Sequence, residues 1–220
     1  MRTQFDQQLD QLHVEMIRMG SLCEEVISLS SKALENSQPR LIQQIIEVDS
    51  QIDRKEREIE SFCIRLLLQR QPVARDLRVI SAALKMISDM EQIGDQAADI
   101  AELAPYISGS VLQSKVHLAD MARAAVQMVT ESIDAFVKTD ADLAAKVVQD
   151  DDTVDRLFDK IKEELMELIY QKNIDAKPAL DVLMAAKYFE RIGDHAVNIA
   201  EWVDYSITGI HKTHETQNDL

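Results

Sequence analysis

Hydrophobic residues recur along the chain with the spacing of long helices. In the first segment they are separated by alternating steps of three and four residues, at Leu9, Leu12, Met16, Met19, Cys23 and Val26. This seven-residue repeat is typical of long helices that pack nearly parallel to one another. Together with the prolines and glycines that interrupt it, the pattern predicts helices at 4–36, 39–69, 73–106, 111–138, 140–172 and 176–208.

The second half of the chain repeats the first. Residues 91–102 read EQIGDQAADIAE, and residues 190–201 read ERIGDHAVNIAE. Earlier in each copy, an Asp-x-x-x-Asp pair at 49–53 aligns with another at 151–155. Two such copies predict an all-α protein built by tandem duplication of a three-helix bundle. We expect the first repeat at 1–108, the second at 109–208 and a flexible tail at 209–220.

The composition supports this fold and excludes several classes of protein. Only 5 glycines and 4 prolines in 220 residues argue against a collagen-like or loop-rich chain. The two cysteines, Cys23 and Cys63, fall on helical seams and are expected in the core rather than in a disulfide. A net charge of −15 argues against nucleic-acid binding. Without an apolar run of membrane-spanning length or a signal peptide, we expect a soluble, intracellular protein.

Acidic residues four positions apart are repeated in both copies. The pairs are Asp49/Asp53, Glu91/Asp95, Asp151/Asp155 and Glu190/Asp194, and Asp99 extends the first row. Residues four apart share one face of a helix, and helical angles place Glu91 and Glu190 on the core-facing stripe. Because burying an unpaired carboxylate is unfavourable, these side chains need a cation, a proton or hydrogen-bond donors.

The residues leave two explanations of these acids open. They form a solvated helix face, or they meet around a metal ion bound only by oxygens. Oxygen ligands suit Mg²⁺, Mn²⁺, Ca²⁺ or iron, and zinc is less natural without histidine or cysteine ligands. The Glu-x-x-His motif of di-iron proteins is absent, and His195 is expected to be a surface or groove histidine. Gly94 and Gly193 indicate either close helix packing or backbone access beside the acids.

Four arginines stand out against the acidic background. Arg65, Arg70, Arg75 and Arg78 surround the turn predicted at Gln71-Pro72. They form a solvated helix end, or a contact for an acidic partner or a membrane-side surface. The spacing does not select between these alternatives.

Several motifs resemble one bacterial family. RQPVARDLR at 70–78, EQIGD at 91–95 and ERIGD at 190–194 are similar to motifs of the PhoU family of phosphate-transport regulators. The resemblance covers about residues 5–208, including the duplicated three-helix plan. It implies a cytoplasmic homodimer, peripheral to the inner face of the plasma membrane. The implied partners are a phosphate ABC transporter, through its ATPase subunit, and a sensor histidine kinase.

The resemblance also implies a function and a set of metal ligands. The function is a non-enzymatic adaptor that represses the phosphate-starvation response when phosphate is plentiful. The ligands are Asp49, Asp53, Glu91, Asp95, Asp99, Asp151, Asp155, Glu190 and Asp194, with Mg, Mn, Fe or Zn, divalent or ferric, as the bound ion. Gln92 and Asn198 depart from the family pattern. The alternative is a carboxylate-bridged metalloenzyme of the helical-bundle type, although the sequence shows no positioned base.

Overall fold

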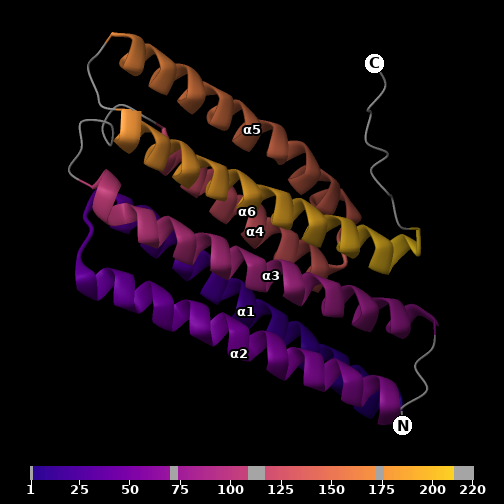
Figure 1. Ribbon diagram of the computed structural model, residues 1–220. Coiled ribbons are helices and arrows are strands. Elements are labelled where there is room, and N and C mark those ends of the chain that lie inside the picture. The colour runs from indigo at the N-terminus through magenta and orange to yellow at the C-terminus, as the bar shows by residue number, and fades with distance from the viewer. Residues whose placement is uncertain (1, 70–73, 109–116, 172–175, 211–220) are drawn as a thin grey trace.

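The computed structural model describes residues 2–69, 74–108, 117–171 and 176–210. Within these ranges the chain forms six helices (Figure 1), namely α1 (Arg2–Glu35), α2 (Pro39–Gln69), α3 (Ala74–Ile107), α4 (Leu118–Lys138), α5 (Ala141–Tyr170) and α6 (Ala176–Thr208). The all-α prediction is confirmed. The fourth helix was predicted to begin at 111 and so to include His117. That prediction is wrong for His117, which is the N-cap residue that precedes α4.

The helices form two three-helix units that pack side by side. Helices α1, α2 and α3 contact one another, as do α4, α5 and α6. The units meet where α1 packs on α4 and α3 packs on α6 (Figure 1). Helices α2 and α5 contact only helices of their own unit among the described residues. Each outer helix therefore forms a seam with α3 or α6, and these seams carry the repeated acids.

The core follows the seven-residue seams of the sequence. Leu12, Met16, Met19 and Cys23 on α1 are fully buried, and Cys63 on α2 is buried as well. Both cysteines therefore lie in the core, as predicted. Alanines such as Ala97 on α3 are also fully buried, and small side chains let helix backbones approach closely.

A turn with defined caps sets the position of α5. Thr139 adopts the left-handed conformation (φ 55°, ψ 45°) at the C-terminus of α4. Asp140 then caps α5, because its carboxylate accepts a hydrogen bond from the Leu143 backbone N–H at 3.0 Å. Thr139 and Asp140 alone therefore connect α4 to α5.

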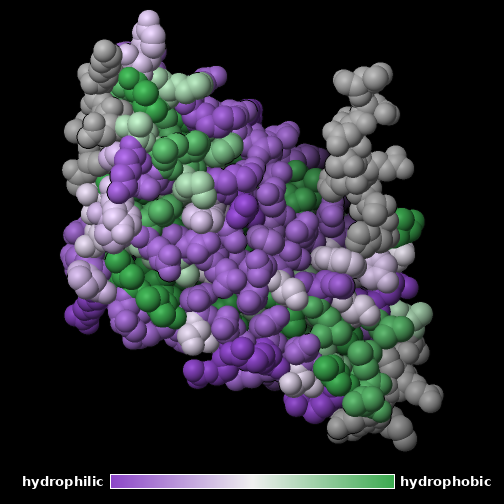
Figure 2. Space-filling view, in the orientation of Figure 1, coloured by the Kyte–Doolittle hydropathy of each residue, from purple (hydrophilic) through white to green (hydrophobic). Residues whose placement is uncertain are grey.

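The surface divides into a hydrophilic middle and two more hydrophobic ends. Figure 2 shows this division on the face that displays α2, α3, α6 and α5. The exposed hydrophobic side chains near the two hairpin ends are Ile64, Leu68 and Leu77 on α2 and α3, and Met166, Ile169, Tyr170, Leu180 and Met184 on α5 and α6. None of the described helices combines the length and the hydropathy needed to cross a membrane.

Candidate metal centre

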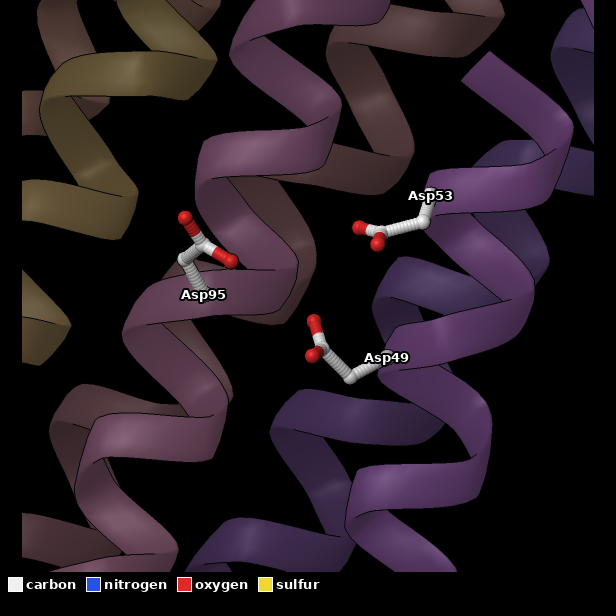
Figure 3. Close-up of side chains that lie close together, drawn as sticks. All are labelled: Asp49, Asp53 and Asp95. Carbon is white, nitrogen blue, oxygen red and sulfur yellow. The ribbon is translucent and has the colours of Figure 1, made fainter. Parts of the chain in front are cut away.

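Three aspartates meet on the seam between α2 and α3. Asp49 and Asp53 lie one turn apart on α2, and Asp95 faces them from α3 (Figure 3). One carboxylate oxygen from each residue lies within 4.8 Å of the other two. No other group of three potential metal ligands approaches this closely in the described part of the chain. The structure thus brings together Asp49, Asp53 and Asp95, three of the residues predicted from the sequence.

The innermost oxygen of this cluster has no hydrogen-bond partner. Asp49 Oδ1 is buried and unpartnered. It packs against the backbone of Gly94, where a Cβ atom would lie only 2.8 Å from it. A buried carboxylate oxygen without a donor is unfavourable unless a proton or a cation satisfies it. The missing side chain of Gly94 therefore makes room for an oxygen that a proton or a cation could satisfy.

The electrostatics of the cluster are those of crowded acids. The pKa of Asp49 is raised to about 6, first by burial and then by the negative charges of Asp95, Asp53, Glu91 and Asp99. The pKa of Asp95 is also raised, first by burial and then by the neighbouring carboxylates. Such mutual repulsion disfavours the ionised acids when no cation is bound.

Sequence reasoning missed one acid of this cluster. Burial, followed by the charge of Glu91, raises the pKa of Glu56 on α2. Glu56 follows Asp49 and Asp53 at the i, i+4, i+7 spacing of one helix face, so helical periodicity could have found it. Glu91 accepts a hydrogen bond from the Gln92 side chain at 2.7 Å. Gln92 thus supplies a neutral donor at the position where the family resemblance led us to expect arginine.

The second repeat builds a related cluster between α5 and α6. Asp151 Oδ1 is again buried without a hydrogen-bond partner, and a Cβ atom at Gly193 would lie 3.2 Å from it. The pKa of Asp151 is raised to about 6, first by burial and then by the charges of neighbouring carboxylates, of which Asp155 has the largest effect. Here, however, a lysine enters the cluster, since Lys187 forms an ion pair with Glu190.

Asp99 and Asn198, which the sequence analysis singled out, take part in the contact between the repeats. Asp89 on α3 lies 3.0 Å from both His195 Nδ1 and Asn198 Nδ2 on α6. Because an ionised carboxylate only accepts, both nitrogens donate to it. In the same direction, the Tyr188 hydroxyl on α6 donates a hydrogen bond to Asp99 on α3. Asn198, which replaces an acid expected in the second copy, thus has an inter-repeat partner.

The arginines near the end of the bundle where α2 is followed by α3 have different environments. Arg65 is exposed and stacks over Phe62, with its guanidinium carbon 5.6 Å from the ring centroid. Arg75 is exposed and lines a pocket of about 340 Å³ together with Asp6 and Asp76. Arg78 is partly buried and donates to the Ser206 carbonyl at 3.4 Å, so it joins α3 to α6. Arg70 lies outside the described residues.

The donor set determines which ligand the clusters suit. Carboxylates from two facing helices present several oxygens to one point, and no cysteine or histidine is needed to complete the first group. Hard cations such as Mg²⁺, Mn²⁺, Ca²⁺ and ferric iron prefer such ligands. The buried oxygens of Asp49 and Asp151 have no hydrogen-bond partner, so each is available as a ligand. The residues present therefore fit a bound cation.

Comparison with known proteins agrees with the duplicated architecture. The PhoU domain matches the chain twice, at residues 16–104 and 118–203. The chain belongs to the PhoU family. A phosphate-specific transport system accessory protein PhoU homolog of Pseudomonas aeruginosa is 37% identical over 213 residues, which cover 96% of this chain and 88% of that protein. The Escherichia coli accessory protein PhoU is 30% identical over 218 residues, covering 99% and 90%.

Solved PhoU structures have the same fold. The crystal structure of PhoU from Pseudomonas aeruginosa superposes with a TM-score of 0.82 and 35% identity, covering 94% of this chain and 100% of that one. The phosphate transport system regulatory protein PhoU from Streptococcus pneumoniae gives a TM-score of 0.85 at 25% identity, covering 95% and 99%. The family assignment made from the sequence motifs is therefore confirmed.

Proposed function

We propose that this protein is a non-enzymatic negative regulator of the phosphate-starvation response that also modulates phosphate uptake. The observation that carries the proposal is the match of both repeats to the PhoU domain. Relatives that span nearly the whole chain are named accessory proteins of the phosphate-specific transport system. Regulation by protein contact needs surfaces rather than a reactive group.

The regulator acts as an adaptor between two membrane-associated partners. These are the ATPase subunit of a phosphate ABC transporter and a sensor histidine kinase, as the family resemblance implies. Exposed Arg65 and Arg75, on a protein of net charge −15, offer attraction to an acidic surface of either partner. The resemblance further implies a homodimer at the inner face of the plasma membrane, and sedimentation analysis tests the dimer.

Metal ions bound in the acidic clusters complete the proposal. A cation would satisfy the buried oxygens of Asp49 and Asp151 and relieve the repulsion among their neighbours. When bound, it supplies positive charge that holds α2 against α3 and α5 against α6. Elemental analysis of the purified protein, before and after chelation, tests this part.

Deletion of the gene tests the regulatory role. We expect phosphate-regulon genes, such as one for a secreted phosphatase, to be active in the deletion strain even in high phosphate. A plasmid copy of the wild-type gene should restore repression. Normal repression in the deletion strain would contradict the proposal.

A turnover assay separates the regulator from a metalloenzyme. Purified protein loaded with Mn²⁺ or Mg²⁺ is incubated with generic phosphate monoesters and diesters. We expect no hydrolysis above that of a sample carrying Glu91→Ala and Asp95→Ala. Hydrolysis that depends on these two acids would favour the enzyme instead.

A further inference from the structure

Three of the differences between the two acidic clusters, at positions that the repeat alignment makes equivalent, reduce the net negative charge of the second. Ser88 in the first copy corresponds to Lys187 in the second, at the offset that aligns EQIGD with ERIGD. Asp99 corresponds to Asn198 at the same offset. Glu56 corresponds to Phe158 at the offset that aligns Asp49 with Asp151. Each of the three differences makes the second cluster less negative than the first.

Lys187 lies at the edge of the second cluster, with its side chain 38% exposed. Its ammonium pairs with Glu190, whose side chain is only 14% exposed. The same ammonium lies 5.6 Å from the centroid of the Phe158 ring on α5. Its positive charge also lowers the pKa values of Asp155 and Asp194 relative to what burial and their acidic neighbours would give. Lys187 therefore reaches across the seam from α6 toward α5.

The first cluster has no comparable internal cation. Every charged group that acts on Asp49 and Asp95 is another carboxylate. Arg57 on α2 approaches Asp53, but its side chain is 67% exposed and its nitrogen lies 3.9 Å from the Asp53 carboxylate. Two differences between the repeats act in the opposite direction, because Asp152 and Asp159 stand where the first copy has Ser50 and Arg57. Both aspartates are exposed, so solvent screens their charges.

We propose that the Lys187 ammonium is a resident cation of the second cluster, so that a divalent cation binds the first cluster more tightly than the second. The inference rests on the proposed metal binding. A divalent ion at the second cluster must displace or approach Lys187, whereas the charged groups that act on Asp49 and Asp95 in the first cluster are carboxylates. The two repeats would therefore fill at different cation concentrations.

Mn²⁺ titrations of the full-length chain, followed by calorimetry, test the inference one cluster at a time. Glu91→Ala with Asp95→Ala leaves the second cluster, and Glu190→Ala with Asp194→Ala leaves the first. In the first background, adding Lys187→Ser should tighten Mn²⁺ binding about tenfold, as expected for removing a unit charge a few ångströms away. In the second background, the reciprocal Ser88→Lys should weaken binding by a similar factor.

Two controls separate the charge of Lys187 from other effects. Lys187→Arg keeps the charge and should leave the second cluster weak. Lys162→Ser removes a lysine that lies 5.2 Å from the same Phe158 ring but pairs with exposed Asp159, and should have little effect. Circular dichroism confirms that each variant folds, and Lys187→Ser alone decides the question if Ser88→Lys does not fold.

The outcomes distinguish this inference from the proposed function. Equal Mn²⁺ affinities of the two clusters, unchanged by Lys187→Ser, would overturn the inference and leave metal binding intact. Absence of Mn²⁺ binding to the wild-type chain and to every variant would overturn both this inference and the proposed metal binding.

Discussion

Gly94 on α3 lies against the carboxylate of Asp49 on α2, at a point where a side chain would collide with that carboxylate. A Cβ atom at Gly94 would lie 2.8 Å from Asp49 Oδ1, closer than a carbon and an oxygen normally approach. The same relationship recurs in the second repeat, where the corresponding distance from Gly193 to Asp151 Oδ1 is 3.2 Å. The two interpretations of these glycines, close packing and access to the acids, are therefore two descriptions of one contact.

Alanine at Gly94 should weaken cation binding at the first cluster. The added methyl group must push the Asp49 carboxylate out of position, although alanine favours the helix by about 1 kcal/mol over glycine. We expect Gly94→Ala to reduce Mn²⁺ affinity at the first cluster about tenfold or more, with little loss of thermal stability. Titration with Mn²⁺ and a thermal melt in chelator measure the two effects.

Gly193→Ala is the matched control for this variant. The longer distance at the second cluster leaves the Asp151 carboxylate closer to its place. We expect a smaller loss of affinity there. A loss equal to or larger than that of Gly94→Ala would show that contact distance does not govern the effect.

Acid should stabilise the metal-free protein. The pKa values of Asp49 and Asp151 are raised to about 6, above their unfolded values near 3.8, so the folded state binds protons more tightly. The stabilisation is therefore complete below the unfolded pKa and is lost as pH rises through about 6. We expect the melting temperature in chelator to be higher near pH 5 than near pH 7.5.

Substitution and metal identify the source of that pH dependence. Asp49→Asn with Asp151→Asn should flatten the melting profile between these pH values, since the replaced groups no longer titrate. Saturating Mg²⁺ should also flatten it, because a cation stabilises the ionised carboxylates. A profile that keeps its full slope in the double variant would assign the effect to other groups.

The sequence predicted the helices well because apolar periodicity dominates a chain of long amphipathic segments. The seam residues from Leu9 to Val26 and the repeated EQIGD and ERIGD motifs sufficed for the duplicated bundle. The sequence also indicated the one-turn pairing of Asp49 with Asp53. It could not show that Asp99 is bonded to Tyr188, or that Lys187 enters the second cluster. Those contacts depend on how α6 packs against α3 and α5, which helical spacing within one segment does not encode.

The contact between Asp89 and α6 should contribute to holding the two repeats together. Removing the carboxylate with Asp89→Ala leaves His195 and Asn198 without their acceptor. We expect the free energy of unfolding to fall by about 1 to 3 kcal/mol. Urea denaturation measures the loss, and Asn198→Ala and the double variant complete a cycle. An interaction energy near zero in that cycle would mean that Asp89 and Asn198 act independently.

Charge reversal of exposed arginines should weaken the contact with acidic partners. Arg65 and Arg75 are the suitable positions, because both are exposed and Arg78 is joined to Ser206. Electrostatic attraction falls with salt, so Arg65→Glu with Arg75→Glu should reduce capture of the kinase or transporter most at low ionic strength. We expect partial release of repression in cells, with helix content and metal binding unchanged.

Two other exposed arginines provide the control for this variant. Arg18 and Arg123 pair only with Glu15 and Asp120, one turn away on their own helices, among the ion pairs of the described residues. Changing them to glutamate alters the net charge by the same amount as the first variant. If attraction depends on position, only the Arg65 and Arg75 variant should lose partner capture and repression. Equal losses in both variants would assign the effect to net charge, and normal repression in both would place the interface on another face.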